Sequence, residues 1–147
     1  MYNSTRRRRK MRLHTTSKYA IRILSYMANG DSSSLFHAKH ISEELDISYK
    51  FLSKIMNELV KAEFIISLRG RDGGYKLAKD ASSISIMEIV NLFNDFNHKE
   101  ECLLGIGKCD GANPCATHAK WVRPKSLLEE MFESTTLQNL EGDGFKI

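Results

Sequence analysis

The chain has 147 residues, 41% of them hydrophobic, which is enough for one domain with a core of its own. No apolar run approaches the roughly 18 residues of a membrane-spanning helix, and no secretory leader is visible, so we expect a soluble cytoplasmic protein without a membrane partner. The net charge of +4 is uneven, with five basic groups and no acidic ones in residues 1–10, and 11 acidic against 6 basic in residues 80–147. The basic first half favours a polyanionic partner.

Residues 1–10, with the run Arg6-Arg7-Arg8-Arg9-Lys10, are expected to be a disordered basic extension, and Met11 is an alternative natural start. A helix is predicted from Thr15 or Thr16, as N-cap, to about Asn29. Its apolar residues recur at the i, i+3, i+4, i+7 spacing of a core-facing helix: Ala20, Ile23, Leu24 and Met27.

Residues 37–63 contain two further helical patterns joined by a short turn. The first pattern is about two turns long and ends at Asp46-Ile47, and Ser48 is the expected N-cap of the second. Two helices joined in this way are typical of a helix-turn-helix motif. The outward face of the second helix gives the candidate DNA-binding residues Ser48, Tyr49, Lys50, Ser53 and Lys54. An ordinary amphipathic helix pair with a solvated polar face is the alternative.

A β-hairpin is predicted directly after the second helix. Residues 64–68 are apolar and β-branched, a glycine-rich turn follows, and residues 75–77 alternate as a returning strand. Arg69 and Arg71 lie at the tip, where an arginine can enter a narrow minor groove. A solvated hairpin tip is the alternative. The predicted fold is therefore mainly α, a winged helix-turn-helix domain with a small β-hairpin wing.

Two more helices are predicted in the second half. Ser85 and Glu88 form a capping box at the start of a helix that reaches to about Phe96. Asn113-Pro114 is expected to open the last helix, as N-cap and first helical residue.

Pro124 should kink or restart this last helix. Its apolar face is expected to pack against a second subunit, which makes it a C-terminal dimerisation helix. The interface residues expected are Leu128, Met131 and Phe132. Residues 135–140 are expected to form a short final turn, and residues 141–147 a mobile tail.

All three cysteines fall in one glycine-rich segment between these two helices. Three thiols and one imidazole within 17 residues can converge on one point: Cys102, Cys109, Cys115 and His118. The dipole of the predicted helix would favour the thiolate of Cys115. The pattern indicates a metal or cluster site, and thiols without a ligand are the alternative. The odd count and the size of the chain do not favour a disulfide scaffold.

Several of these stretches together resemble the IscR/NsrR-type transcriptional regulators, over about residues 11–140. They are Met11-Arg12-Leu13, the helix with Tyr19-Ala20, Arg69-Gly70 with Gly73-Gly74-Tyr75, the cysteine segment, and Cys115-Ala-Thr-His118-Ala-Lys-Trp121. The resemblance implies a homodimeric bacterial regulator with residues 11–80 reading a pseudo-palindromic DNA operator. As in the cluster-bearing members of this group, it also implies an iron–sulfur cluster held by the three cysteines within residues 81–140.

The cysteine spacing is one residue longer than in the most familiar members of this group, and the added residue lies among the glycines. His118 matches the fourth ligand of one branch, and this ligand set suits a [2Fe–2S] cluster. Such a cluster would sense iron–sulfur status, oxidative stress or nitrosative stress. A structural zinc on the same four residues, or no cofactor, is the alternative within the class. A thiol redox enzyme with Cys115 as nucleophile is the remote alternative, because no partner base is recognisable.

Overall fold

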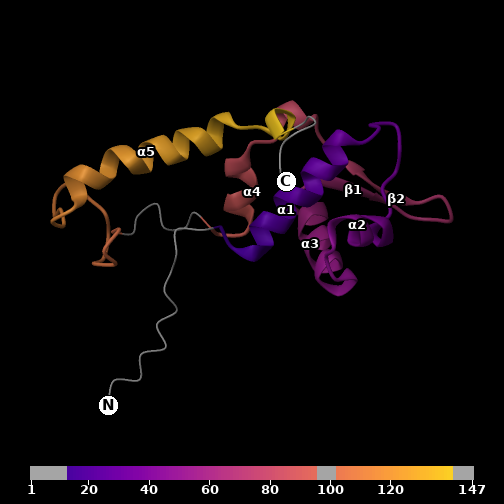
Figure 1. Ribbon diagram of the computed structural model, residues 1–147, viewed down its shortest axis with the longest axis horizontal. Helices are drawn as coiled ribbons and strands as arrows, with labels where there is room; N and C mark the ends of the chain where they lie inside the picture. The colour runs from indigo at the N-terminus through magenta and orange to yellow at the C-terminus, as the bar shows by residue number, and fades with distance from the viewer. Residues whose placement is uncertain (1–12, 96–101, 141–147) are drawn as a thin grey trace, which may run out of the picture.

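The computed structural model describes residues 13–95 and 102–140, so the expected extension at 1–10 and tail at 141–147 lie outside the described residues. The body is helical and carries one two-stranded antiparallel sheet, which confirms the winged helix-turn-helix prediction. Helix α1 (Thr15–Asn29) lies at its centre, with α4 on one side and α2 and α3 on the other (Figure 1). No helix in the described part of the chain has the length and apolar character needed to cross a membrane.

Helix α1 has the predicted bounds, but His14, not Thr15 or Thr16, occupies its N-cap position. The backbone N–H of His14 donates to the Asp95 carboxylate at 3.0 Å, and its ring Nδ1 pairs with the same group. The Asp95 side chain is only 2% exposed, whereas that of His14 is 62% exposed. These contacts therefore hold the start of α1 against the segment around Asp95, which follows helix α4.

Helices α2 (Ala38–Leu45) and α3 (Tyr49–Lys61) form the predicted helix-turn-helix. Asp46 ends α2 in the left-handed conformation, with φ of 51°, which Asp adopts more readily than most non-glycine residues. Ile47 is buried between the two helices at 3% exposure. Ser48 occupies the N-cap position of α3, although its side chain makes no capping hydrogen bond.

Strands β1 (Ile65–Leu68) and β2 (Gly74–Leu77) pair antiparallel and form the predicted wing. The wing is attached to the body because Phe36 and Tyr75 exchange two backbone hydrogen bonds of 2.8 Å. Gly73 is required at the tip, since a Cβ there would lie 2.2 Å from the Leu68 carbonyl oxygen.

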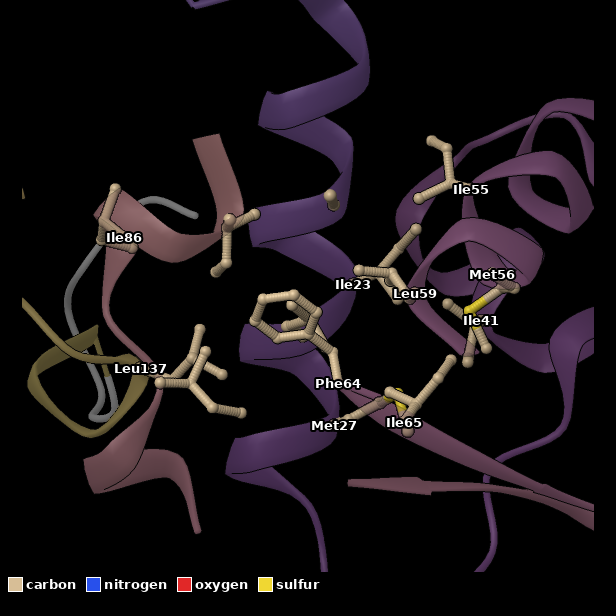
Figure 2. Packing of buried hydrophobic residues seen from close by; sticks show 14 of the residues in the cluster. Ile23, Met27, Ile41, Ile55, Met56, Leu59, Phe64, Ile65, Ile86 and Leu137 are labelled. Carbon is tan, nitrogen blue, oxygen red and sulfur yellow. The ribbon is translucent and has the colours of Figure 1, made fainter. Parts of the chain in front are cut away.

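One apolar core joins the helices, the wing and the end of the chain (Figure 2). Burial of apolar surface from water is the main contribution to its stability. The largest fully buried side chains include Ile23 and Leu24 of α1, Ile41 of α2, Leu52, Ile55, Met56 and Leu59 of α3, Ile89 of α4, and Leu137. The position of Leu137 means that the chain returns to the body after its last long helix.

Helix α4 (Ile86–Leu92) follows a short 3-10 turn, η1 (Ala81–Ser83), and begins with the predicted Ser85–Glu88 capping box. Its predicted end at Phe96 is wrong, because the helix stops at Leu92. Asn94 has a positive φ of 58°, which no helix accommodates.

Helix α5 (His118–Ser134) begins four residues later than predicted and has Thr117, not Asn113, at its N-cap position. The Asp110 side chain accepts hydrogen bonds from the N–H groups of Ala112 and Asn113, both at 2.8 Å, and so continues the loop past the predicted start. The helix does not restart at Pro124, because α5 runs through this residue.

Helix α5 extends from the body in one long arm (Figure 1). The chain after it turns through η3 (Leu137–Leu140) and packs beside α1 and η1.

Candidate functional site

The polar face of α3 presents the expected DNA-binding side chains on the molecular surface. Ser48, Tyr49, Lys50 and Lys54 are exposed, and Ser53 is half-buried. The opposite face of α3 is the buried one that anchors the helix in the core. A helix held in this way can enter a major groove with its polar face free.

The wing adds positive charge beside this helix. Arg69 and Arg71 are exposed at the tip between β1 and β2, next to Gly70, whose φ of +115° favours glycine. Within residues 13–95 and 102–140, neither arginine forms an ion pair, and neither do Lys50 and Lys54. These cations are therefore available to an anionic partner.

A hollow of about 410 Å³ lies where α2 meets the start of α3, and it is lined by Lys39, Ser42, Glu43 and Tyr49. Lys39 was not among the residues predicted from sequence. Its position in the first turn of α2 could have identified it, because the first helix of a helix-turn-helix motif crosses the DNA backbone.

The second candidate site is the cysteine loop, residues 102–117, together with His118 at the start of α5. Cys102 and Cys115 lie with their sulfurs 3.0 Å apart, the Cys102 thiol donating. Cys109 Sγ lies 3.5 Å from Nδ1 of His118. The four predicted ligands are thus arranged as two pairs, formed by residues 13 and 9 positions apart.

Cys115 precedes α5 and does not lie on its first turn, contrary to the sequence prediction. The predicted direction of its acidity still holds, for a different reason. A hydrogen bond from the Cys102 thiol, followed by bonds from the Thr117 side chain and backbone, lowers the pKa of the Cys115 thiol to about 7. Hydrogen bonds to the charged form of a group favour that form.

The donor set fits a metal centre in kind, since three sulfurs and one imidazole nitrogen are ligands for iron–sulfur clusters and for zinc. Among the residues that the structure describes, no three such side chains gather at a single point. Two thiolates on one tetrahedral metal lie roughly 3.8 Å apart, so the Cys102–Cys115 pair would have to separate slightly. Gly105 and Gly107 permit such adjustment, with φ of +72° and +66° and no atoms within 4 Å of a Cβ.

The third candidate site is an exposed surface on helix α5. None of its 17 residues is buried, and Leu127 and Met131 are 54% and 49% exposed on one face. Two of the predicted interface residues are placed differently from Met131. Phe132 packs against the core, and Leu128 is half-buried.

Comparison with known families identifies the chain. The Rrf2 family, described as iron-dependent transcriptional regulators, matches residues 13–143. The chain belongs to the Rrf2 family. The expected resemblance to IscR-type regulators is confirmed, because IscR of Escherichia coli is 32% identical over 130 residues, which are 88% of this chain and 80% of that protein. A protein of Aquifex aeolicus named as an HTH-type transcriptional regulator is 38% identical over 85% of this chain and 88% of its own length.

Two solved structures share the fold. CymR of B. subtilis, described as the global cysteine regulator, superposes with a TM-score of 0.75 at 23% identity, covering 88% of this chain and 95% of its own. IscR of T. potens gives a TM-score of 0.68 at 22% identity, covering 88% and 85%. The relatives are transcriptional regulators and not enzymes, so this Rrf2 protein is a transcriptional regulator of a DNA-binding family.

Proposed function

We propose that this regulator reads double-stranded DNA with the polar face of α3 and the wing. The proposed contacts in α3 are Ser48, Tyr49, Lys50, Ser53 and Lys54. Arg69 and Arg71 of the wing would reach a minor groove, and Lys39 of α2 would contact a phosphate. The support is that these side chains, apart from the half-buried Ser53, are exposed on α2, the polar face of α3 and the wing, without ion pairs in the described part of the chain.

The active form is a homodimer on a pseudo-palindromic operator, with α5 as the pairing helix. A long arm with exposed Leu127 and Met131 is suited to a partner of the same kind. Its first half carries Lys120, Arg123 and Lys125, and its second half carries Glu129, Glu130 and Glu133. Two antiparallel copies place each basic half on an acidic half, which a two-fold axis permits.

The cysteine loop holds a [2Fe–2S] cluster through Cys102, Cys109, Cys115 and His118. The observation that carries this proposal is the pairing of all four donors by the loop, Cys102 with Cys115 and Cys109 with His118. When bound, the cluster supplies a redox-active centre that oxidants or nitric oxide can attack. The loop's own contribution is to present three cysteine sulfurs and one imidazole between α4 and α5.

The cluster state would set the affinity for DNA. The loop connects α4, which packs on α1, to the proposed pairing helix α5, so a change in its order would alter how two recognition helices are spaced. Iron–sulfur status, oxidative stress and nitrosative stress are the candidate signals.

Anaerobic purification followed by a visible spectrum and iron and sulfide analysis tests the cluster. The proposal expects a coloured protein with two irons and two sulfides per chain. Colourless protein with one zinc per chain would favour a structural zinc on the same three cysteines and histidine. Colourless protein without metal would leave the thiols without a ligand.

A further inference from the structure

The three thiols of the cysteine loop have different neighbours. The Cys102 and Cys115 sulfurs lie 3.0 Å apart, and a disulfide bond is about 2.0 Å long, so the two sulfurs need to approach by about 1 Å. Cys109 is paired with the imidazole of His118 instead of with a thiol. One thiol pair is thus poised for oxidation, and the third cysteine is not.

The loop can accommodate this approach. Cys102 is fixed by backbone hydrogen bonds, its N–H donating to Gly107 at 3.0 Å and its carbonyl accepting from Gly105 at 2.8 Å. Cys115 lies in the irregular segment before α5, where regular helical geometry does not fix it. Gly111, between the two, has no atom within 4 Å of a Cβ position, so this part of the loop is open.

We propose that the cluster-free protein forms an intramolecular disulfide between Cys102 and Cys115 and keeps Cys109 as a thiol. The bond requires only the two thiols and an oxidant. Its consequence, a block on cluster loading, rests on the proposed function, because the bond removes two of the three sulfur donors. Reduction of the bond would restore them.

Hydrogen peroxide is a sufficient oxidant for this step. Cys102 is buried, with 6% exposure, and Cys115 is half-buried, so the Cys115 sulfur reacts first. It attacks one peroxide oxygen, breaks the O–O bond and becomes a sulfenic acid, with release of one water. The Cys102 sulfur then attacks the sulfenic sulfur, and its proton leaves with the hydroxyl as a second water. Two thiols lose two electrons, and the peroxide gains them.

The test is disulfide mapping on the full chain, freed of cluster, reduced, desalted and treated with hydrogen peroxide. Remaining thiols are alkylated, and chymotrypsin, which cleaves after Leu103 or Leu104, together with an Asp-specific protease that cleaves before Asp110, places each cysteine on a separate peptide. Mass spectrometry should find Cys102 linked to Cys115 and Cys109 alkylated. A bond to Cys109, or three alkylated cysteines after treatment, would overturn the inference.

Two cysteine-to-serine variants serve as controls for the disulfide mapping. Cys109→Ser should give the same linked product as the unchanged chain, and Cys115→Ser should give no bond between Cys102 and the rest of the loop. Loss of the product in Cys109→Ser would contradict the unequal roles of the three thiols.

Cluster reconstitution separates this inference from the proposed function. The oxidised sample should remain colourless, and the same sample after thiol reduction should take up iron and sulfide. If the disulfide maps as proposed but the reduced protein takes up no cluster, the proposed function fails and the disulfide stands. If the reduced protein loads a cluster but no disulfide maps, the inference fails alone. An oxidised sample that loads as well as the reduced one contradicts the block.

Discussion

Asp95 is a buried carboxylate that receives both the backbone N–H and the ring of His14. The backbone bond satisfies a donor at the N-terminal end of α1, as a capping side chain would. The contact with the exposed imidazole, which is an ion pair only when the ring is protonated, is screened by water and contributes less. Asp95 therefore matters more to stability than His14 does, because its removal also leaves the helix start without an acceptor.

The first prediction compares the two partners. Asp95→Ala should lower the free energy of unfolding by about 1–2 kcal/mol, the usual cost of a lost helix cap. His14→Ala retains the backbone N–H and should cost roughly 0–1 kcal/mol, as for an exposed ion pair. Chemical denaturation of both variants measures the difference. Equal losses of unfolding free energy would mean that the imidazole, and not the backbone hydrogen bond, accounts for the stabilising effect of this contact.

The second prediction concerns the proposed ligands. Cys→Ser at Cys102, Cys109 or Cys115 should remove almost all visible absorbance of the anaerobic protein, because a hydroxyl is a poor substitute for a thiolate. His118→Ala should assemble a cluster in lower yield, and His118→Cys should hold one more firmly. Iron and sulfide contents measure the yields. Full cluster content in His118→Ala would remove His118 from the ligand set.

At the scale of the elements, the sequence predicted α1, α2, α3 and the wing within a residue or so. Their signals are local, since apolar periodicity and turn chemistry both act over a few residues. The start of α5 was missed although Asn113-Pro114 has the chemistry of a helix start, because the Asp110 carboxylate binds the backbone of that segment instead. The burial of Leu137 depends on contacts with distant elements, which no local pattern reports.

The predicted site residues also differ in whether a local sequence pattern could locate them. Those on α3 and the wing followed from helix and hairpin periodicity, which fixes the face or tip that each occupies. The pairing within the cysteine loop could not be predicted, because several pairings are compatible with one spacing. Lys39 was missed since its proximity to Tyr49 arises only from the packing of α2 against α3.

The third prediction separates the wing from the recognition helix. Arg69→Ala should weaken DNA binding by about 1–3 kcal/mol and reduce any preference for A·T-rich flanks. Lys54→Ala should weaken binding to all sequences alike and lower the salt slope by about one. Lys61→Ala is the control, because Lys61 pairs with Glu58 at 2.9 Å at the far end of α3. Retained affinity in an Arg69 and Arg71 double variant would refute a DNA contact by the wing.

The fourth prediction concerns α5 as a pairing helix. Met131→Asp should raise the dimer dissociation constant at least tenfold, or about 1.4 kcal/mol, by placing a charge in an apolar contact. Ser126→Asp adds the same charge at an exposed polar position of the same helix and should change it less. Sedimentation analysis measures both. A wild-type chain that is monomeric at micromolar concentration would contradict pairing altogether.

At the scale of the whole molecule, the regulator has two ends with different charge and different chemistry. The helix-turn-helix and wing lie on one side of α1, and α4 with the α5 arm on the other (Figure 1). Between them α1 contacts α2, α3 and α4, and the Asp95–His14 contact joins α1 to the chain that leads into the cysteine loop. This continuous packing is a physical route from the loop to the end that is proposed to read DNA.

The most direct test of this account is the DNA affinity of cluster-loaded and cluster-free protein, measured at one fixed salt concentration. The DNA would be a site selected by the protein from a random double-stranded pool, with each form used for a selection. We expect the two forms to differ about fivefold or more on at least one selected site. Equal affinities on every selected site would contradict regulation by the cluster and leave the loop with a structural role.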